Sequence, residues 1–143
     1  MTSPVQAYYR HEHGENPALL QSPRDVDVLI DTLLASGPSE NLASLHSLER
    51  PLMPAGFPDH ELLVGANGDL QLGVLAFTDE KVMVSFDPLA GRPEVCYSIM
   101  GSATEFPSCS EIPISLVRQA VKEFLLSGGR QPTCIEWQEP EFW

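Results

Sequence analysis

The sequence has no long apolar run, few cysteines and few basic residues, and each shortage excludes a class of protein. Its apolar stretches, around residues 62–64, 72–77 and 116–126, are too short or too interrupted to span a bilayer. Because no basic region followed by an apolar run stands near Met1, we expect no secretory signal, no membrane contact and a cytoplasmic location. The 3 cysteines stand at scattered positions, which agrees with a reducing compartment.

Basic side chains are outnumbered by acidic ones. The 143 residues include 8 Lys and Arg against 20 Asp and Glu, which gives a formal net charge of −12. Proteins that bind nucleic acid directly usually have the opposite balance, because Lys and Arg contact the phosphates, so we expect no direct contact with nucleic acid. The acidic residues are spread along the chain, which favours an acidic folded surface that attracts a basic partner. An equal alternative is that these charges only keep the protein soluble.

Two segments have the apolar periodicity of amphipathic helices. The first begins near Ser22, whose side chain suits an N-cap before Pro23, and Asp25 completes a pattern that resembles a capping box. The second ends at the glycine pair 128–129. The apolar stripes consist of Val26, Leu29, Ile30, Leu33 and Leu34 in the first segment, and of Leu116, Val117, Ala120, Val121, Phe124 and Leu125 in the second.

Several shorter segments have the composition of β-strands. Asn67 and Gly68 predict a two-residue type I′ turn between two of them, because both positions tolerate positive φ. We expect the strands within residues 60–100 to pair as successive antiparallel neighbours, a meander, with the strand at 41–48 on its edge. The predicted strands are residues 5–10, 41–48, 60–66, 70–77, 81–86, 94–100 and 133–137.

The order of these elements predicts an α+β fold, in which an antiparallel meander of about four to six strands packs with two amphipathic helices. Residues 50–58, which include three prolines, and residues 101–110 are expected to be irregular. The length of 143 residues fits a single domain over residues 1–143, and we expect a monomer.

No pattern typical of an enzyme, cofactor or metal site stands out. His11 and His13 are close in sequence, but zinc needs three or four ligands, so we interpret them as the polar end of a strand. Gly65, Gly68 and Gly73 are not followed by a helix and therefore do not form a phosphate-binding loop. We expect no catalytic residue, no metal and no cofactor.

The cysteines lack the surroundings of a nucleophile. None stands at a predicted helix N-terminus, where the pKa of a thiol would be lowered. Cys96 and Cys134 lie in predicted strands and are expected to be buried structural thiols, whereas Cys109 lies in a predicted loop and is expected to be exposed. A small cysteine hydrolase that uses Cys109 or Cys134 stays open as an alternative.

The C-terminal segment mixes carboxylates with aromatic rings, as protein-binding surfaces do. Carboxylates around a tryptophan attract Lys and Arg of a partner, while the ring supplies buried contact. Trp137 fits the core and an interface equally well, because it lies in a predicted strand. The predicted loops 101–111 and 138–143 bracket that strand. Together they predict a partner-binding surface that consists of Glu105, Glu111, Trp137, Glu139, Glu141, Phe142 and Trp143.

Several stretches of the sequence have the pattern of a known family. They are most specific in the C-terminal third, where Gly128-Gly129 is followed by Glu136-Trp137, and least specific in residues 48–59. The matching stretches are residues 8–14, 22–27, 59–62, 64–65, 104–107, 111–113, 120–124, 128–133 and 136–137. On these stretches the chain resembles immunity protein family one of bacterial polymorphic toxin systems, of the actinobacterial type.

The resemblance implies a non-enzymatic inhibitor that binds a cognate intracellular toxin before the toxin harms the producing cell. Such toxins are often nucleic-acid deaminases or nucleases, and an acidic inhibitor can cover the basic active-site region of either. The resemblance transfers no contact residues. An acidic adaptor or chaperone, which binds a secreted effector without inhibiting it, stays open as an alternative.

Overall fold

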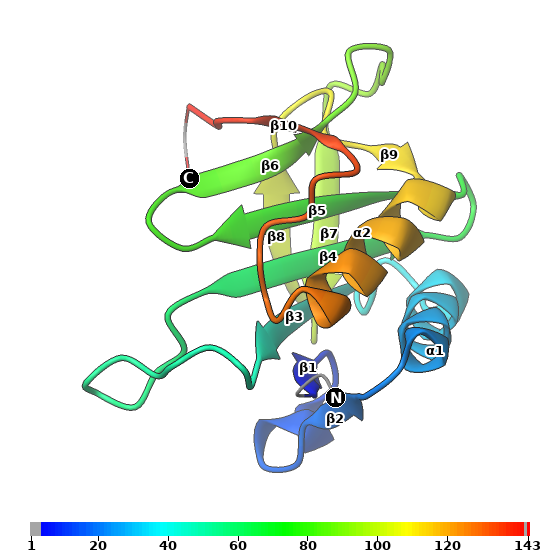
Figure 1. The fold of residues 1–143 in the computed structure, drawn as a ribbon. Helices are drawn as coiled ribbons and strands as arrows, with labels where there is room; N and C mark the ends of the chain where they lie inside the picture. Colours follow the sequence, from blue (N-terminus) through cyan, green and yellow to red (C-terminus); the bar gives the residue numbers. More distant parts are fainter. Residues whose placement is uncertain (1–3, 142) are drawn as a thin grey trace.

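The computed structural model describes residues 4–141 and 143 (Figure 1). Within these residues, two α-helices, one short 3₁₀ helix and ten β-strands follow one another. In chain order they are β1 (Val5–Tyr8), η1 (His11–Gly14), β2 (Ala18–Leu20), α1 (Pro23–Ala35), β3 (Leu42–Ser47), β4 (Glu61–Asn67), β5 (Leu72–Thr78), β6 (Val82–Phe86), β7 (Val95–Ile99), β8 (Ser102–Phe106), β9 (Ile112–Pro113), α2 (Ile114–Leu126) and β10 (Glu136–Gln138).

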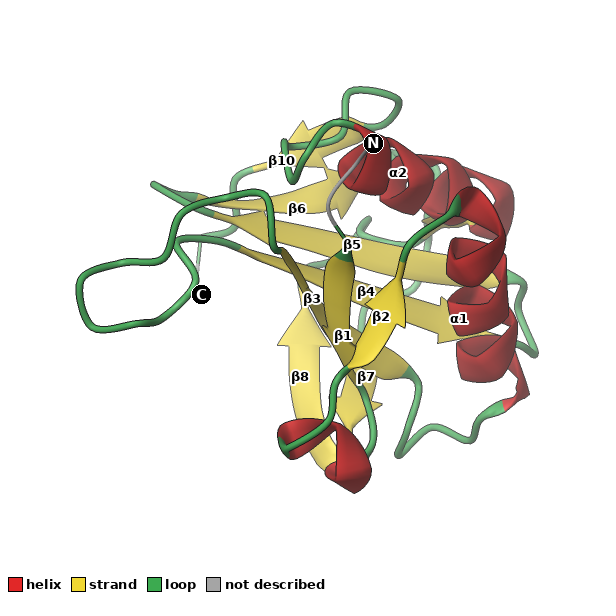
Figure 2. Ribbon diagram, turned by 60° about the horizontal axis from the view of Figure 1, so that its bottom comes forward, coloured by secondary structure: helices red, strands yellow, loops and turns green. Residues whose placement is uncertain are grey.

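The elements form three layers. The two helices cover one face of the main sheet, and a ribbon of β7 and β8 covers the opposite face (Figure 2). In the described residues the main sheet has eight strands, in the order β10-β6-β5-β4-β3-β1-β2 with β9 paired to β5. These strand pairs are antiparallel.

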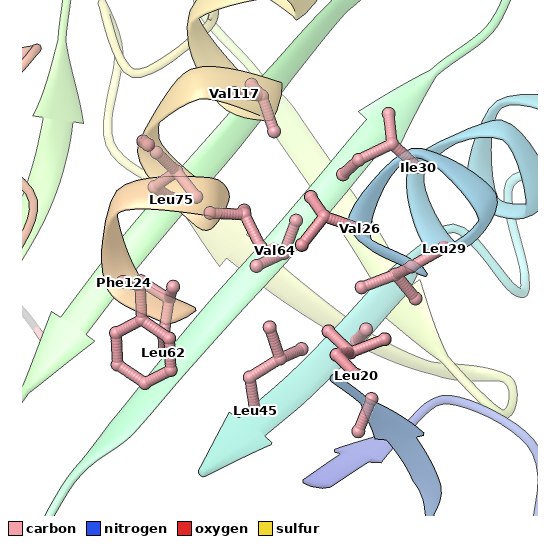
Figure 3. Packing of buried hydrophobic residues seen from close by; sticks show 14 of the residues in the cluster. Leu20, Val26, Leu29, Ile30, Leu45, Leu62, Val64, Leu75, Val117 and Phe124 are labelled. Atoms are coloured by element: carbon pink, nitrogen blue, oxygen red, sulfur yellow. The ribbon is translucent and has the colours of Figure 1, made fainter. Parts of the chain in front are cut away.

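Helix α1 begins where its sequence predicts. Ser22 Oγ accepts a hydrogen bond from the Asp25 N–H at 3.3 Å, and Pro23 occupies the first turn. The Asp25 carboxylate accepts from the Gln21 N–H at 2.8 Å, so the reciprocal bond of the expected capping box falls one residue earlier. The buried face of the helix, which packs on the sheet (Figure 3), consists of Val26, Leu29, Ile30 and Leu33.

Both faces of the central strands are buried, which explains why β4 and β5 read as nearly continuous apolar runs. Leu62, Val64 and Leu75 pack with Phe124 of α2 in the larger core (Figure 3). Each large apolar side chain buried in this way contributes about 1.5–3 kcal/mol to folding. A second core, between the main sheet and the ribbon, consists of Leu42, Val74, Ala76, Val84, Val95, Tyr97 and Phe106.

The ring of Tyr97 in the ribbon lies directly against Gly65 of β4. A Cβ atom at this position would lie 2.7 Å from Cδ2 of Tyr97, so only glycine lets the buried ring lie against the strand. The side chain of Asn41 also connects the main sheet to the ribbon, since its Oδ1 accepts a hydrogen bond from the Ser98 N–H of β7 at 2.9 Å. Strand β7 is therefore fixed on the face of the main sheet and not at its edge.

The α+β class and the two helices are confirmed, but the predicted meander is wrong after β6. Strand β7 pairs with β8 in the ribbon, and β10 occupies the position next to β6. Strand β3 lies inside the main sheet between β4 and β1, and more strands form than expected. Residues 102–106, which were expected to be irregular, form β8.

Two local predictions are also wrong. The β4–β5 turn covers residues 68–71 instead of two residues, and Gln71, with φ 53°, takes the left-handed conformation expected of Gly68. The Asn67 Oδ1 atom accepts the N–H groups of Asp69 and Leu70 at 3.0 and 3.1 Å, which stabilises the longer turn. The polar segment at His11 and His13, expected to end a strand, forms the 3₁₀ helix η1.

Candidate functional site

The segment after β10 and the end of β8 enclose a groove at one end of the main sheet. Because β10 runs antiparallel to β6, the chain after Gln138 continues toward the end of the sheet where β6 begins. The groove has a volume of about 650 Å³. Its lining residues are Glu105, Phe106, Pro107, Ser108, Gln138, Glu139, Pro140, Glu141 and Trp143.

Trp143 forms an accessible wall of this groove. Its indole Nε1 donates a hydrogen bond to the Glu105 carbonyl oxygen at 3.1 Å, and its ring packs on Phe106 with 5.1 Å between centroids. The residue nevertheless stays 47% exposed. An aromatic ring held in place and half open to solvent can contact a partner without first being ordered.

The groove is acidic, because its lining among the described residues includes Glu105, Glu139 and Glu141 and no Lys or Arg. In the described part of the chain, none of these three carboxylates forms an ion pair with a basic side chain. Their charges therefore add and favour a cationic group in the groove.

Glu111, predicted to lie on an exposed binding loop, is buried instead. Its carboxylate accepts two hydrogen bonds from Arg92, at 2.7 and 2.8 Å, and one from the Tyr97 hydroxyl at 2.8 Å. Burial and the adjacent Glu111 charge raise the pKa of Tyr97, which keeps the phenol protonated as a donor. Glu111 joins the ribbon to the main sheet, so its expected place at the partner-binding surface is corrected.

The remaining predicted residues have different surroundings. Trp137 is half-buried against the larger core, and its Nε1 donates to the Pro132 carbonyl oxygen at 2.8 Å. Phe142 lies outside the described residues. Of the predicted set, the structure thus brings together Glu105, Glu139, Glu141 and Trp143 in one groove.

Five residues that line the groove are absent from the predicted set, and two of them hold the groove together. The five are Phe106, Pro107, Ser108, Gln138 and Pro140. Phe106 is buried beneath Trp143, although it lies in a segment expected to be irregular. Gln138 Nε2 donates to the carbonyl oxygens of Ser85 and Ser108, at 3.1 and 3.2 Å, and so joins the C-terminal segment to the rest of the groove. A large apolar side chain in a polar segment, directly before Pro107, could have indicated that Phe106 is buried. Nothing in the sequence indicates the hydrogen bonds of Gln138.

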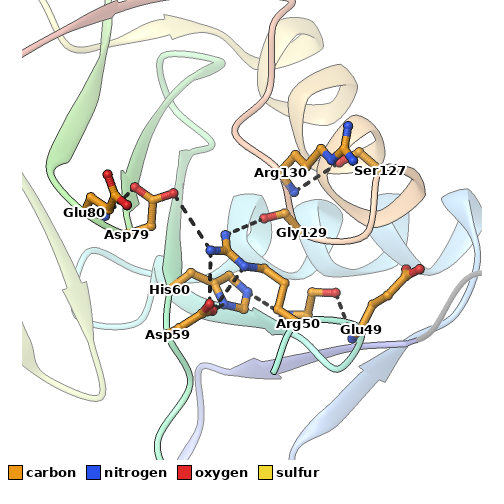
Figure 4. Close-up of polar contacts among 10 residues, drawn as sticks. Glu49, Arg50, Asp59, His60, Asp79, Glu80, Ser127, Gly129 and Arg130 are labelled. Carbon is orange, nitrogen blue, oxygen red and sulfur yellow. Dashed lines mark hydrogen bonds and ion pairs between the residues drawn. The ribbon is translucent and has the colours of Figure 1, made fainter. Parts of the chain in front are cut away.

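The pair Asp59 and His60, near Ser47, has the composition of a catalytic triad but not its geometry. His60 Nδ1 lies 2.9 Å from Asp59 Oδ1, and Nε2 accepts the backbone N–H of Ser47 at 2.8 Å (Figure 4). The nitrogen that would act as the base is therefore occupied by a main-chain donor. Burial lowers the pKa of His60, which also keeps the ring neutral.

The cysteines differ from their predicted surroundings. Cys96 is exposed and Cys134 is half-buried, so the expectation of two buried thiols is wrong. Cys109, expected to be exposed, is half-buried and its Sγ lies 3.3 Å from the Ala90 carbonyl oxygen. Burial and the Glu123 carboxylate raise the pKa of Cys134, which lowers its thiolate fraction and its nucleophilicity.

The described residues contain no group of three or more His, Cys, Asp or Glu side chains that could hold a metal ion. His13 Nδ1 accepts hydrogen bonds from the backbone N–H groups of Tyr9 and Arg10, at 3.2 and 3.0 Å. This nitrogen therefore stabilises the turn between β1 and η1. Neither helix in the described part of the chain is long and apolar enough to cross a membrane.

Comparison with known protein families identifies the family of this chain. The family model described as Immunity protein Imm1 matches residues 14–139, which is most of the chain. The match includes β8 and β10, on which the groove is built. No curated protein matches the chain.

Proposed function

Because the chain belongs to the Imm1 immunity protein family, we propose that it binds a cognate toxin domain and neutralises it, without catalysing a reaction of its own. The proposed toxin acts on nucleic acid, as a deaminase or a nuclease, and carries a basic active-site region. The chain covers that region in the cytoplasm as a single-domain monomer, in a one-to-one complex.

The acidic groove is the observation that carries this proposal. A toxin that holds nucleic acid needs Lys or Arg side chains, which combine an apolar stem with a cationic head. The groove offers a matching pair of features, namely the half-exposed ring of Trp143 and the carboxylates of Glu105, Glu139 and Glu141. The ring can pack on the stem or the cation, and the carboxylates can accept its hydrogen bonds.

Co-expression with the toxin domain encoded beside the gene of this chain tests the proposal. We expect growth to be restored and a stable complex to form, with a Kd measurable by calorimetry. The variant Glu105→Gln/Glu139→Gln/Glu141→Gln should weaken binding by about tenfold or more, because it removes three negative charges and replaces one acceptor oxygen of each carboxylate with an N–H donor. A complex that forms without suppressing toxicity would instead identify an adaptor.

A matched variant separates the groove from the overall charge. Glu12→Gln/Glu15→Gln/Asp69→Asn removes the same number of charges from exposed positions outside the groove. It should leave the Kd within about twofold of the unmodified chain. Equal weakening by both variants would show that net charge alone matters, and the placement in the groove would be wrong.

A further inference from the structure

The loop between β3 and β4 carries large apolar side chains that stay exposed in the described part of the chain. Leu52 is 63% exposed, Met53 52% and Phe57 67%. They belong to a segment that projects beyond the strands, at the lower left of Figure 1. We call residues 51–58 the apolar loop. A cluster of exposed apolar side chains on a folded protein marks a surface that another molecule covers.

The apolar loop has a defined shape. The Met53 N–H donates to the Phe57 carbonyl oxygen at 2.7 Å, and an antiparallel bridge joins the two ends of the loop. The Gly56 N–H donates to the Met53 carbonyl oxygen at 2.8 Å and closes a turn with Pro54 at its second position. Gly56 has φ 86°, which glycine adopts without strain. The loop is thus formed before any partner arrives.

Arg50 fixes the base of the apolar loop. Its guanidinium contacts the Asp59 carboxylate at 3.1 and 3.2 Å, so it joins the two ends of the loop (Figure 4). It also donates to the Gly129 carbonyl oxygen at 3.0 Å and lies 3.9 Å from the Asp79 carboxylate. One side chain therefore ties the loop to the turn after α2 and to the β5–β6 turn.

The apolar loop and the acidic groove lie at the same end of the main sheet. The loop leads into β4 at the end where β5 finishes and β6 begins, and the segment after β10 runs toward that same end. Figures 1 and 2 both show the loop and the C-terminus on this side of the molecule. The two features can therefore contact one partner at once.

We propose that the apolar loop is the hydrophobic part of the toxin-binding surface and inserts into an apolar hollow beside the basic region of the toxin. This inference rests on the proposed function. Exposed carboxylates of Glu49, Asp79 and Glu80 lie at the base of the loop together with the basic side chains of Arg50 and Arg130 (Figure 4). The acidic groove adds three carboxylates to the same end of the sheet, on a chain with net charge −12. An anionic membrane or a second copy of this acidic end would be repelled, whereas a basic protein surface is attracted.

The test replaces the three apolar side chains in the variant Leu52→Ser/Met53→Ser/Phe57→Ser. Binding to a catalytically inactivated form of the toxin domain encoded beside the gene is followed by surface plasmon resonance. We expect affinity to fall by about tenfold or more, mainly through faster dissociation, because buried apolar anchors act on the bound complex. The thermal melting curve should be unchanged, since these side chains lie outside both cores.

A control variant carries the same kind of change elsewhere. Val28, Leu70 and Leu89 are also exposed, and Val28→Ser/Leu70→Ser/Leu89→Ser should leave the affinity unchanged. If the unmodified chain binds and the loop variant binds equally well, the loop proposal is overturned and the proposed function stands. If the unmodified chain neither binds nor protects, the proposed function itself fails. A loop-dependent dimer of the free chain, detected by sedimentation, would assign the loop to a second copy and also overturn the proposal.

Discussion

At the residue scale, the two ring nitrogens of His60 have fixed and different partners. Nε2 accepts the Ser47 N–H, so the proton of the neutral ring lies on Nδ1 and is donated to Asp59. Burial lowers the pKa of His60, and a protonated ring would also direct an N–H at the Ser47 N–H. The unfolded chain takes up this proton near the ordinary pKa of about 6.5, whereas the folded chain stays neutral to lower pH.

We therefore expect the free energy of unfolding to fall as the pH decreases from about 8 to about 5.5, because the unfolded state then binds more protons than the folded state. His46, whose pKa is also lowered by burial, acts in the same direction. His60→Gln should reduce the pH dependence measured by urea titration. An unchanged pH dependence in His60→Gln would contradict this assignment.

The two tryptophans should separate stability from binding. Trp137 packs on the larger core, so Trp137→Ala should lower the free energy of unfolding by about 2 kcal/mol. Trp143 is half-exposed and covers Phe106 at the edge of the second core, so Trp143→Ala should lower the free energy of unfolding by less, about 1 kcal/mol or below. The second change should still weaken toxin binding in calorimetry. A Trp143→Ala variant with unchanged Kd would remove this ring from the binding surface.

At the scale of elements, sequence reasoning succeeds where the signal is local. The stripes of α1 and α2 predict both helices, because a helix that packs with one face repeats its apolar residues every three or four positions. Strand β8 gives no such signal, since most of its residues are exposed. The position of β7 depends on Gly65 and on contacts far along the chain, which periodicity does not encode.

The candidate site was predictable to a similar extent. The acidic and aromatic composition of the C-terminal segment predicts a surface, and the structure places Glu105 beside Glu139, Glu141 and Trp143. Glu111 has the same composition signal but is buried, because Arg92 compensates its charge from a distant part of the chain. Composition reports which side chains suit a surface, whereas burial is decided by long-range packing.

The contacts of Glu111 lead to a prediction about the ribbon. Glu111→Gln should lower the free energy of unfolding by about 1–3 kcal/mol, because it weakens the charge-assisted bonds from Arg92 and gives the Tyr97 hydroxyl a weaker acceptor to donate to. Hydrogen exchange should become faster in β7 and β8 than in β3 and β4. Glu139→Gln, in the open groove, is the control. Uniform protection in Glu111→Gln would show that this carboxylate does not hold the ribbon.

At the scale of the whole molecule, the net charge of −12 should act on the rate of association. We expect the association rate constant with a basic toxin domain to fall steeply as salt rises, because added ions screen charges beyond the Debye length of about 10 Å at 0.1 M. The dissociation rate constant should change less, since the apolar contacts are screened little. Stopped-flow measurements across ionic strength check both, and an association rate indifferent to salt would exclude electrostatic steering.

The base of the apolar loop is held by polar contacts, whereas the side chains at its tip are exposed and take no part in the fold. Arg50 holds the base through Asp59 and Gly129, while the side chains of Leu52, Met53 and Phe57 contribute to neither core. Substitutions at the tip therefore change the surface presented to a partner with little effect on folding. A library randomised at these three positions, with the proline, glycine and arginine framework kept, should yield mostly folded proteins. With the apolar loop in the binding role proposed above, substitutions at its tip would change partner choice without changing stability, which makes the loop a place to reprogram recognition.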